Sequence, residues 1–142
     1  MSRIAFGAKD LHTVKAFVEA ESFPGPSLLL AYSPCIAHGY DMAKGAEQQK
    51  LAVDTGHWPL MRYDPRRLAE GKSALQLDSP APKGDLGQYM RQETRYRWVE
   101  NQDPERFKRL LDEARHEARQ RYALYEQLAM IAERISTVPN GF

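Results

Sequence analysis

The feature that most constrains the fold is the apolar run Ser27–Tyr32, "SLLLAY", which shows no alternation of polar and apolar residues. The segment before it, Phe23–Pro26, is a turn signal, because neither of its prolines can donate a backbone hydrogen bond. Pro34 follows the run closely. A short apolar run between turn signals is typical of a β-strand covered on both faces, as in a parallel sheet. The sequence therefore predicts an α/β sheet with one buried strand.

Strand and helix signals alternate through the first half of the chain. The predicted elements are, in order, a strand at Arg3–Phe6, a helix from Asp10, the strand in Ser27–Tyr32, a helix at Asp41–Thr55, a strand in His57–Pro65 and a strand at Ala74–Asp78. Leu11, Val14, Phe17 and Val18 fall at helical spacing in the first helix, and Gly56 is placed to end the second. Pro59 favours an edge strand or a position at the start of a strand. This order predicts a parallel, doubly wound sheet.

A boundary follows at Ser79–Gly84, "SPAPKG", and the pattern then becomes helical. Asp103 is a suitable N-cap and Pro104 a suitable first helical residue. The apolar positions that follow trace one helix face: Phe107, Leu110, Leu111, Ala114, Ala118, Tyr122, Tyr125, Leu128, Ala129, Ala132 and Ile135. Val138–Gly141 should end this helix. We expect residues 1–79 to be the α/β part and residues 80–142 a helical extension.

The predicted sheet is small for its type. A strand buried on both faces needs neighbours on both sides, whereas the first segment reads as only the last part of a strand. We therefore expect the chain to be the end of a larger protein.

Composition limits the classes of function. The 20 basic and 19 acidic residues give a net charge of +1, so the overall charge does not indicate binding to nucleic acid or to an anionic membrane. One cysteine excludes an intrachain disulfide and fits a reducing compartment. The longest apolar run is far shorter than the ~20 residues that span a bilayer, and the first ten residues hold no secretory signal. We expect a soluble cytoplasmic chain.

The single cysteine, Cys35, lies just after the predicted buried strand. Ligands of open α/β sheets collect at the carboxyl ends of the strands, so this position favours a functional role. Four interpretations remain open from the residues alone. Cys35 is a buried filler, a nucleophile activated by His38, a zinc ligand together with histidines, or one ligand of an iron–sulfur cluster completed elsewhere. The available histidines are His12, His38, His57 and His116.

Three long segments resemble one enzyme family. They are Gly7–Met42, which includes "ESFPGPSLLLAYSPCIAHG", Gly45–Arg67 and Glu70–Lys83. Together they are similar to the C-terminal part of pyruvate:ferredoxin (flavodoxin) oxidoreductases, which are thiamine-diphosphate enzymes of pyruvate metabolism. The resemblance implies that residues 1–79 are the end of the thiamine-diphosphate-binding α/β domain. The sequence departs from the family pattern at Leu11-His12, where a glutamine is usual.

The resemblance also implies a reaction and a role for Cys35. In this family pyruvate is oxidatively decarboxylated to acetyl-CoA and CO2, and electrons pass through [4Fe–4S] clusters to ferredoxin or flavodoxin. Cys35, in Ser33-Pro34-Cys35, corresponds to the fourth thiolate ligand of the cluster nearest the thiamine. The family is homodimeric.

Other parts of the family's machinery have no counterpart in this sequence. The Gly-Asp-Gly segment that holds Mg2+ and thiamine diphosphate is absent, as are the other cluster cysteines. We therefore expect the isolated chain to be inactive. The alternative is an independent, non-catalytic α/β scaffold or interaction subunit.

Several further residues are candidates of lower rank. His38 is placed to donate a hydrogen bond to a cluster sulfur, and Asp41 begins a helix whose N-terminus suits an anionic ligand such as coenzyme A. Arg62, Arg66 and Arg67 suit a phosphate or the carboxylates of a partner.

Overall fold

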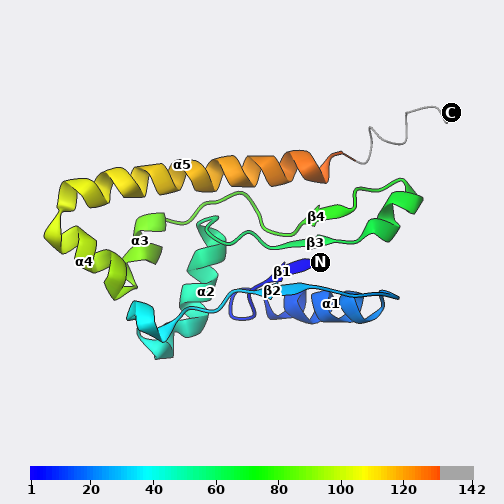
Figure 1. Cartoon of the computed structure of the whole chain (residues 1–142), viewed down its shortest axis with the longest axis horizontal. Coiled ribbons are helices and arrows are strands. Elements are labelled where there is room, and N and C mark those ends of the chain that lie inside the picture. The colour runs from blue at the N-terminus through cyan, green and yellow to red at the C-terminus, as the bar shows by residue number, and fades with distance from the viewer. Residues whose placement is uncertain (132–142) are drawn as a thin grey trace.

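A computed structural model describes residues 1–131 and shows an elongated α/β arrangement (Figure 1). The strands are β1 (Ser2–Ile4), β2 (Leu29–Ala31), β3 (Met61–Tyr63) and β4 (Leu75–Leu77). The α-helices are α1 (Asp10–Glu21), α2 (Gly45–Asp54), α3 (Leu86–Arg91), α4 (Thr94–Gln102) and α5 (Pro104–Ala129). Three short 3₁₀ segments join them: η1 (Ile36–His38), η2 (Met42–Lys44) and η3 (Pro65–Glu70).

The four strands form one sheet in the order β2-β1-β3-β4. β1 and β2 are parallel and are joined by α1, whereas β3 is antiparallel to both β1 and β4. The predicted α/β class is confirmed, but the sheet is mixed and only one pair is parallel. β3 lies between β1 and β4 and is therefore an inner strand. This is compatible with Pro59, which lies two residues before β3 and so removes no hydrogen bond from the ladder.

Two helices cover opposite faces of this sheet. Arg62 of β3 forms an ion pair with Glu19 of α1, while Arg3 of β1 donates to the Tyr125 hydroxyl of α5 at 3.0 Å. Figure 1 shows α1 along one side of the strands and α5 along the other. The result is a helix–sheet–helix sandwich, in which Arg62 of the sheet contacts α1 on one face and Arg3 contacts α5 on the other.

The helices largely follow the sequence pattern. Gly56, with φ 73°, ends α2, and Asp103 caps α5 by accepting from the backbone N–H of Arg106 at 2.9 Å. Phe107, Leu111, Ala118 and Tyr122 of α5 are buried. The predicted positions Ala132 and Ile135 and the predicted stop at Val138–Gly141 lie outside the described residues.

The main hydrophobic core lies between α2, α3 and α5. Its buried members are Ala52, Leu86, Tyr89, Met90, Phe107 and Leu111. The sequence predicted a helical extension over residues 80–142 but did not separate α3 and α4 from α5. Helix α3 supplies half of this cluster, and the partly buried Tyr96 and Val99 of α4 pack against it. None of the described helices is both long and apolar enough to cross a membrane.

The strand predicted to be buried is instead the edge of the sheet. Leu30 and Ala31 of β2 are exposed, and so are Leu11, Val14, Phe17 and Val18, the apolar positions of α1. The prediction of coverage on both faces is therefore wrong for this chain by itself. The physical reason is that β2 has a neighbouring strand on one side only, and that α1 turns its small residues, Thr13 and Ala16, toward the sheet.

Candidate functional site

The candidate site is the Cys35 loop, Ser33–Gly39, at the carboxyl end of the parallel strand pair. Tyr32 donates its backbone N–H to the carbonyl oxygen of Ile4 at 2.9 Å, so β1 and β2 end at the same edge. The chain then passes through Pro34 to Cys35, which is extended (φ −99°, ψ 131°) and precedes η1. The Cys35 side chain is exposed. In this chain by itself, Cys35 is therefore not a buried filler.

Gly39 closes this loop and binds it to the start of α4. Its φ of 70° lies in the left-handed region, and a Cβ there would meet the Thr94 side chain at 2.7 Å. Thr94 donates both its backbone N–H, at 2.8 Å, and its hydroxyl, at 2.7 Å, to the carbonyl oxygen of Gly39. A residue with a side chain would be strained here by its backbone angle and by this contact together.

A buried carboxylate lies behind the loop. Glu93, only 1% exposed, accepts from Gln48 Nε2 at 3.1 Å and from Arg95 Nε at 2.6 Å. Its Oε2 lies 3.6 Å from Nδ1 of His38, three residues after Cys35. A buried charge is tolerated when it is paired and hydrogen-bonded, and Glu93 meets that condition with partners from α2, α4 and the Cys35 loop.

The same contacts define the orientation of the His38 ring. Arg95 Nη1 lies 3.4 Å from Nε2 of His38, and a guanidinium can only donate. Nε2 is therefore the acceptor, and in the neutral ring the proton lies on Nδ1 and faces Glu93. In this arrangement both ring nitrogens are directed at protein groups, so the predicted donation from His38 to a cluster sulfur is not supported by the geometry.

An aromatic cluster packs beneath the loop. The hydroxyl groups of Tyr32 and Tyr89 are 2.7 Å apart, and the rings of His57 and Tyr89 lie 4.6 Å apart between centroids. Burial raises the pKa of both tyrosines, so both are neutral over the physiological range. Burial, followed by the positive charge of Arg121, lowers the pKa of His57 to about 4. These three aromatic side chains are thus uncharged at neutral pH.

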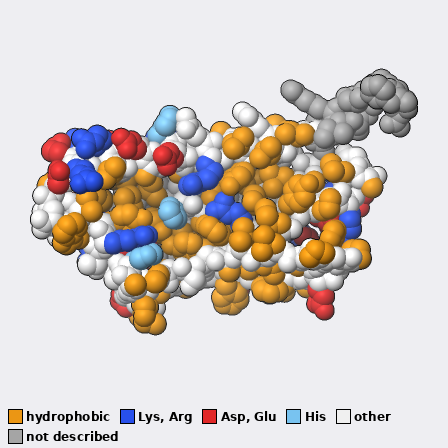
Figure 2. Space-filling model, in the orientation of Figure 1, with side chains coloured by type: hydrophobic (Ala, Val, Ile, Leu, Met, Phe, Trp, Pro, Cys, Tyr) orange, Lys and Arg blue, Asp and Glu red, His pale blue; other side chains and the backbone are white. Residues whose placement is uncertain are grey.

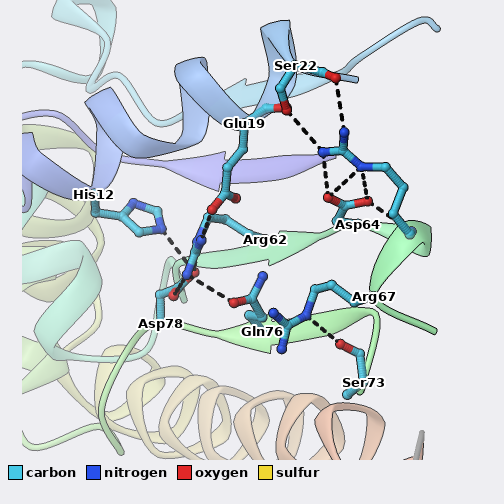
Figure 3. Close-up of polar contacts among 10 residues, drawn as sticks. His12, Glu19, Ser22, Arg62, Asp64, Arg67, Ser73, Gln76 and Asp78 are labelled. Carbon is cyan, nitrogen blue, oxygen red and sulfur yellow. Dashed lines mark hydrogen bonds and ion pairs between the residues drawn. The ribbon is translucent and has the colours of Figure 1, made fainter. Parts of the chain in front are cut away.

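The three arginines considered as phosphate ligands are occupied within the chain (Figure 3). Arg62 donates to Asp78 at 2.7 and 3.0 Å and pairs with Glu19. Arg66 binds Asp64 and Ser22, and Arg67 donates to the carbonyl oxygen of Ser73 at 2.8 Å. Asp41 likewise has a local role, because its carboxylate accepts from the backbone N–H of Ala43 at 3.0 Å and caps η2.

Within residues 1–131 no group of three or more His, Cys, Asp or Glu side chains is arranged to hold a metal ion. His12 is bound to Asp78 at 3.1 Å, on the α1 face of the sheet and apart from the Cys35 loop (Figure 3). The zinc interpretation of Cys35 is therefore not supported. An exposed thiol at the end of parallel strands fits one position of an iron–sulfur cluster, since such clusters take thiolate ligands, and the single cysteine of the sequence excludes a complete cluster site.

The residues that position the loop were not identified from the sequence. Glu93, Thr94 and Arg95 stand in "QETRYRW", within the segment that the sequence predicted only as a helical extension. The available signal was Glu93 itself, an acidic residue three positions after the apolar Met90, but only the fold shows that it is buried. Gln48 carried no signal at all, since a glutamine on a helix is usually exposed.

The fold and the loop together define the class. It is an α/β domain that presents one cysteine at the rim of a parallel strand pair and has an exposed edge strand, β2. Comparison with characterised proteins identifies the relatives of this chain. It is 50% identical over 133 residues to the pyruvate-flavodoxin oxidoreductase of Rhodospirillum rubrum and 46% identical over 129 residues to that of a Nostoc species. It is 38% identical over 129 residues to the pyruvate:ferredoxin oxidoreductase of Moorella thermoacetica.

These matches cover 91–94% of this chain but about 11% of each relative. The chain belongs to the pyruvate-flavodoxin oxidoreductase family and corresponds to one segment of its members. No family model matches it.

Proposed function

We propose that this chain is the part of a pyruvate:flavodoxin or pyruvate:ferredoxin oxidoreductase that supplies Cys35 as one thiolate ligand of a [4Fe–4S] cluster. The full enzyme would convert pyruvate to acetyl-CoA and CO2, with thiamine diphosphate, Mg2+ and the other cluster ligands held by the rest of the polypeptide. The observation that carries this proposal is the exposed position of Cys35 at the carboxyl ends of β1 and β2. When bound, the cluster supplies one-electron transfer toward the flavodoxin or ferredoxin partner.

The residues of this chain would hold the thiol in place. Pro34 restricts the backbone before Cys35, while Gly39 and Thr94 fasten the end of the loop to α4. Glu93 and Arg95 orient His38 and thereby fix η1, the turn that Cys35 begins. The Cys35 thiol would lose its proton on binding iron.

A chimera tests the role of Cys35. We would replace the matched segment of the Rhodospirillum rubrum enzyme by this chain and compare Cys35→Ser with the unchanged chimera. We expect the variant to lose the electron paramagnetic resonance signal of one reduced cluster and up to about four iron ions per chain, since serine is a poor ligand for iron in such clusters. Electron transfer from pyruvate to flavodoxin should fall with it.

Ser33→Ala is the matched control, because Ser33 is in the same loop and its hydroxyl makes only a long contact of 3.5 Å with the carbonyl oxygen of Pro34. The control should retain iron, signal and turnover. A Cys35→Ser chimera with unchanged iron content and spectrum would disprove the proposal. The isolated chain should not bind thiamine diphosphate and should not turn over pyruvate.

A further inference from the structure

Two arginines between the sheet and α5 have no acidic partner within residues 1–131. Arg3 of β1 is only 9% exposed, and Arg121 is a partly buried residue of α5, one turn before Tyr125. The arginines that do form ion pairs with carboxylates in this part of the chain are Arg62, Arg66, Arg91, Arg95 and Arg115. Buried charges in proteins are normally paired, so Arg3 and Arg121 require an explanation.

The contacts of Arg3 are all with neutral groups. Its guanidinium carbon lies 3.9 Å from the centroid of the Trp58 ring, and its Nη1 donates to the Tyr125 hydroxyl at 3.0 Å. Its Nε is buried without a hydrogen-bond partner. Burial, and to a smaller extent the charge of Arg121, lower the pKa of Arg3, against the opposing effect of Tyr125, but a guanidinium stays charged at neutral pH. Arg3 therefore holds a positive charge that the described residues do not neutralise.

Arg121 is also poorly paired. Its Nη2 makes only long contacts, of 3.4 Å each, with the carbonyl oxygens of Gly56 and His57, and its Nε is buried without a partner. After burial, the charges of Arg121 and Arg3 both contribute to the low pKa of His57, so the two guanidinium groups act on the same place. Two positive charges thus meet between α5 and the segment that leads into β3.

The remaining donors of this pair are open to solvent. Nη2 of Arg3 and Nη1 of Arg121 have no hydrogen bond within the described residues, and of these two side chains only the Nε atoms are both buried and unpaired. Figure 2 shows basic side chains and a histidine that reach the surface in the middle of this face, just below the position of α5 in Figure 1, with hydrophobic side chains around them. A ligand can therefore approach the pair from outside.

We propose that Arg3 and Arg121 bind a phosphate group, which accepts hydrogen bonds from the guanidinium N–H groups of both side chains. The planar fork of a guanidinium matches the oxygens of phosphate. Two arginines suit the roughly two negative charges of a phosphate group better than the single charge of a carboxylate. The aromatic surroundings strengthen the attraction because they lower the local dielectric constant. The proposal does not depend on the role of Cys35.

The fluorescence of Trp58 tests this site directly, because the Arg3 guanidinium lies against its ring. Trp98→Phe removes the only other tryptophan, which is 64% exposed on α4. In this variant of the 142-residue chain, inorganic phosphate should change the Trp58 emission with a saturating dependence on concentration. Chloride and acetate at the same ionic strength should not. No saturating change up to about 100 mM phosphate would overturn the proposal, and an equal response to acetate would overturn the choice of phosphate.

Matched substitutions on α5 separate a site from general attraction by positive charge. Arg121→Gln should weaken phosphate binding at least about tenfold, because one of the two charged donors is lost. Arg119→Gln removes the same charge from an exposed position of α5 that forms no ion pair within residues 1–131, and it should bind phosphate as the unchanged chain does. Equal weakening by both substitutions would overturn the proposal.

Thermal unfolding supplies a measurement that does not use Trp58. Phosphate should raise the melting temperature of the unchanged chain and of Arg119→Gln, but not that of Arg121→Gln, because a ligand of the folded state stabilises it. If Arg121→Gln does not fold, Arg121→Lys takes its place, since it keeps the charge but loses the fork and should also bind more weakly. The same rise in all variants would overturn the proposal. Cys35→Ser should bind phosphate normally, so this site and the proposed function fail separately.

Discussion

At the scale of single residues, the Cys35 loop depends on a few groups that lie far away in sequence. Glu93 is the central one, because it is buried and joins Gln48, Arg95 and His38. The sequence singled out Cys35 as a candidate, because it is the one cysteine of the chain and follows an apolar strand. It did not identify Glu93, because the burial of a carboxylate depends on how α2, α4 and the loop meet.

Glu93→Gln should lower the free energy of unfolding by about 1–3 kcal/mol, because the buried hydrogen-bond network loses its charged acceptor. It should also raise the rate at which Cys35 reacts with a thiol reagent, as His38 and η1 lose their support. Urea unfolding and alkylation kinetics of the 142-residue chain measure these effects. Glu100→Gln is the control: its partner Arg91 is partly exposed, so we expect a loss of at most about 1 kcal/mol and an unchanged alkylation rate. An unchanged rate in Glu93→Gln would show that Glu93 does not position the loop.

Gly39 and Gly71 separate two reasons for requiring glycine. Both have positive φ, 70° and 68°, but a Cβ at Gly39 would meet Thr94 at 2.7 Å, whereas one at Gly71 meets nothing within 4 Å. Gly71→Ala should cost about 1 kcal/mol for the backbone angle alone. Gly39→Ala should cost more and should displace the loop from α4. Equal losses in urea unfolding would mean that the Thr94 contact adjusts without cost.

At the scale of elements, α1 is held to the sheet by a polar cluster in place of a large apolar contact (Figure 3). Arg62 of β3 pairs with Glu19 of α1 and with Asp78 after β4, and His12 of α1 reaches the same Asp78. Small residues of α1 face the sheet, and these pairs join α1 to β3 and to the segment after β4. The sequence predicted the helix and its start at Asp10, but the spacing of Leu11, Val14, Phe17 and Val18 did not show that they are exposed, because periodicity identifies a stripe and not what covers it.

Asp78 gives this attachment a pH dependence. Burial raises the pKa of Asp78, but hydrogen bonds from His12 and Arg62 and the charge of Arg62 outweigh this and lower the pKa to about 2. A carboxyl group whose pKa is lower in the folded state stabilises the fold above its unfolded value, 3.8, and this contribution is lost as the pH falls toward 2. The contribution at neutral pH is about 2 kcal/mol.

Asp78→Asn should therefore reduce stability at pH 7 and flatten the acid limb of the stability curve between pH 4 and 2. Denaturant unfolding at a series of pH values measures both. Asp54→Asn, which removes the exposed partner of Lys50, is the control and should change neither appreciably. An acid limb that is identical in Asp78→Asn and the unchanged chain would contradict the assigned role.

At the scale of the whole molecule, the chain is well packed on one side and open on the other. The core between α2, α3 and α5 is closed, while β2 and α1 expose leucine, valine and phenylalanine. This asymmetry agrees with a segment that spans about 11% of its relatives. The division at residue 79 stays a prediction, and α5 packs against β4 across it, so the helical part is not separate from the sheet.

The sequence by itself determined the local features: the α/β order of elements, the capped helix α5, the glycine after α2, the cysteine at a strand end and the family. Each of these depends on neighbouring residues, whose backbone preferences and spacing are visible in a single segment. Only the tertiary structure decided that β3 and β4 run antiparallel, that β2 is an edge and that Glu93 is buried behind Cys35. Those outcomes depend on contacts between residues that are distant in sequence. Their free energy depends on how the strands and helices pack together, which no single segment of the sequence shows.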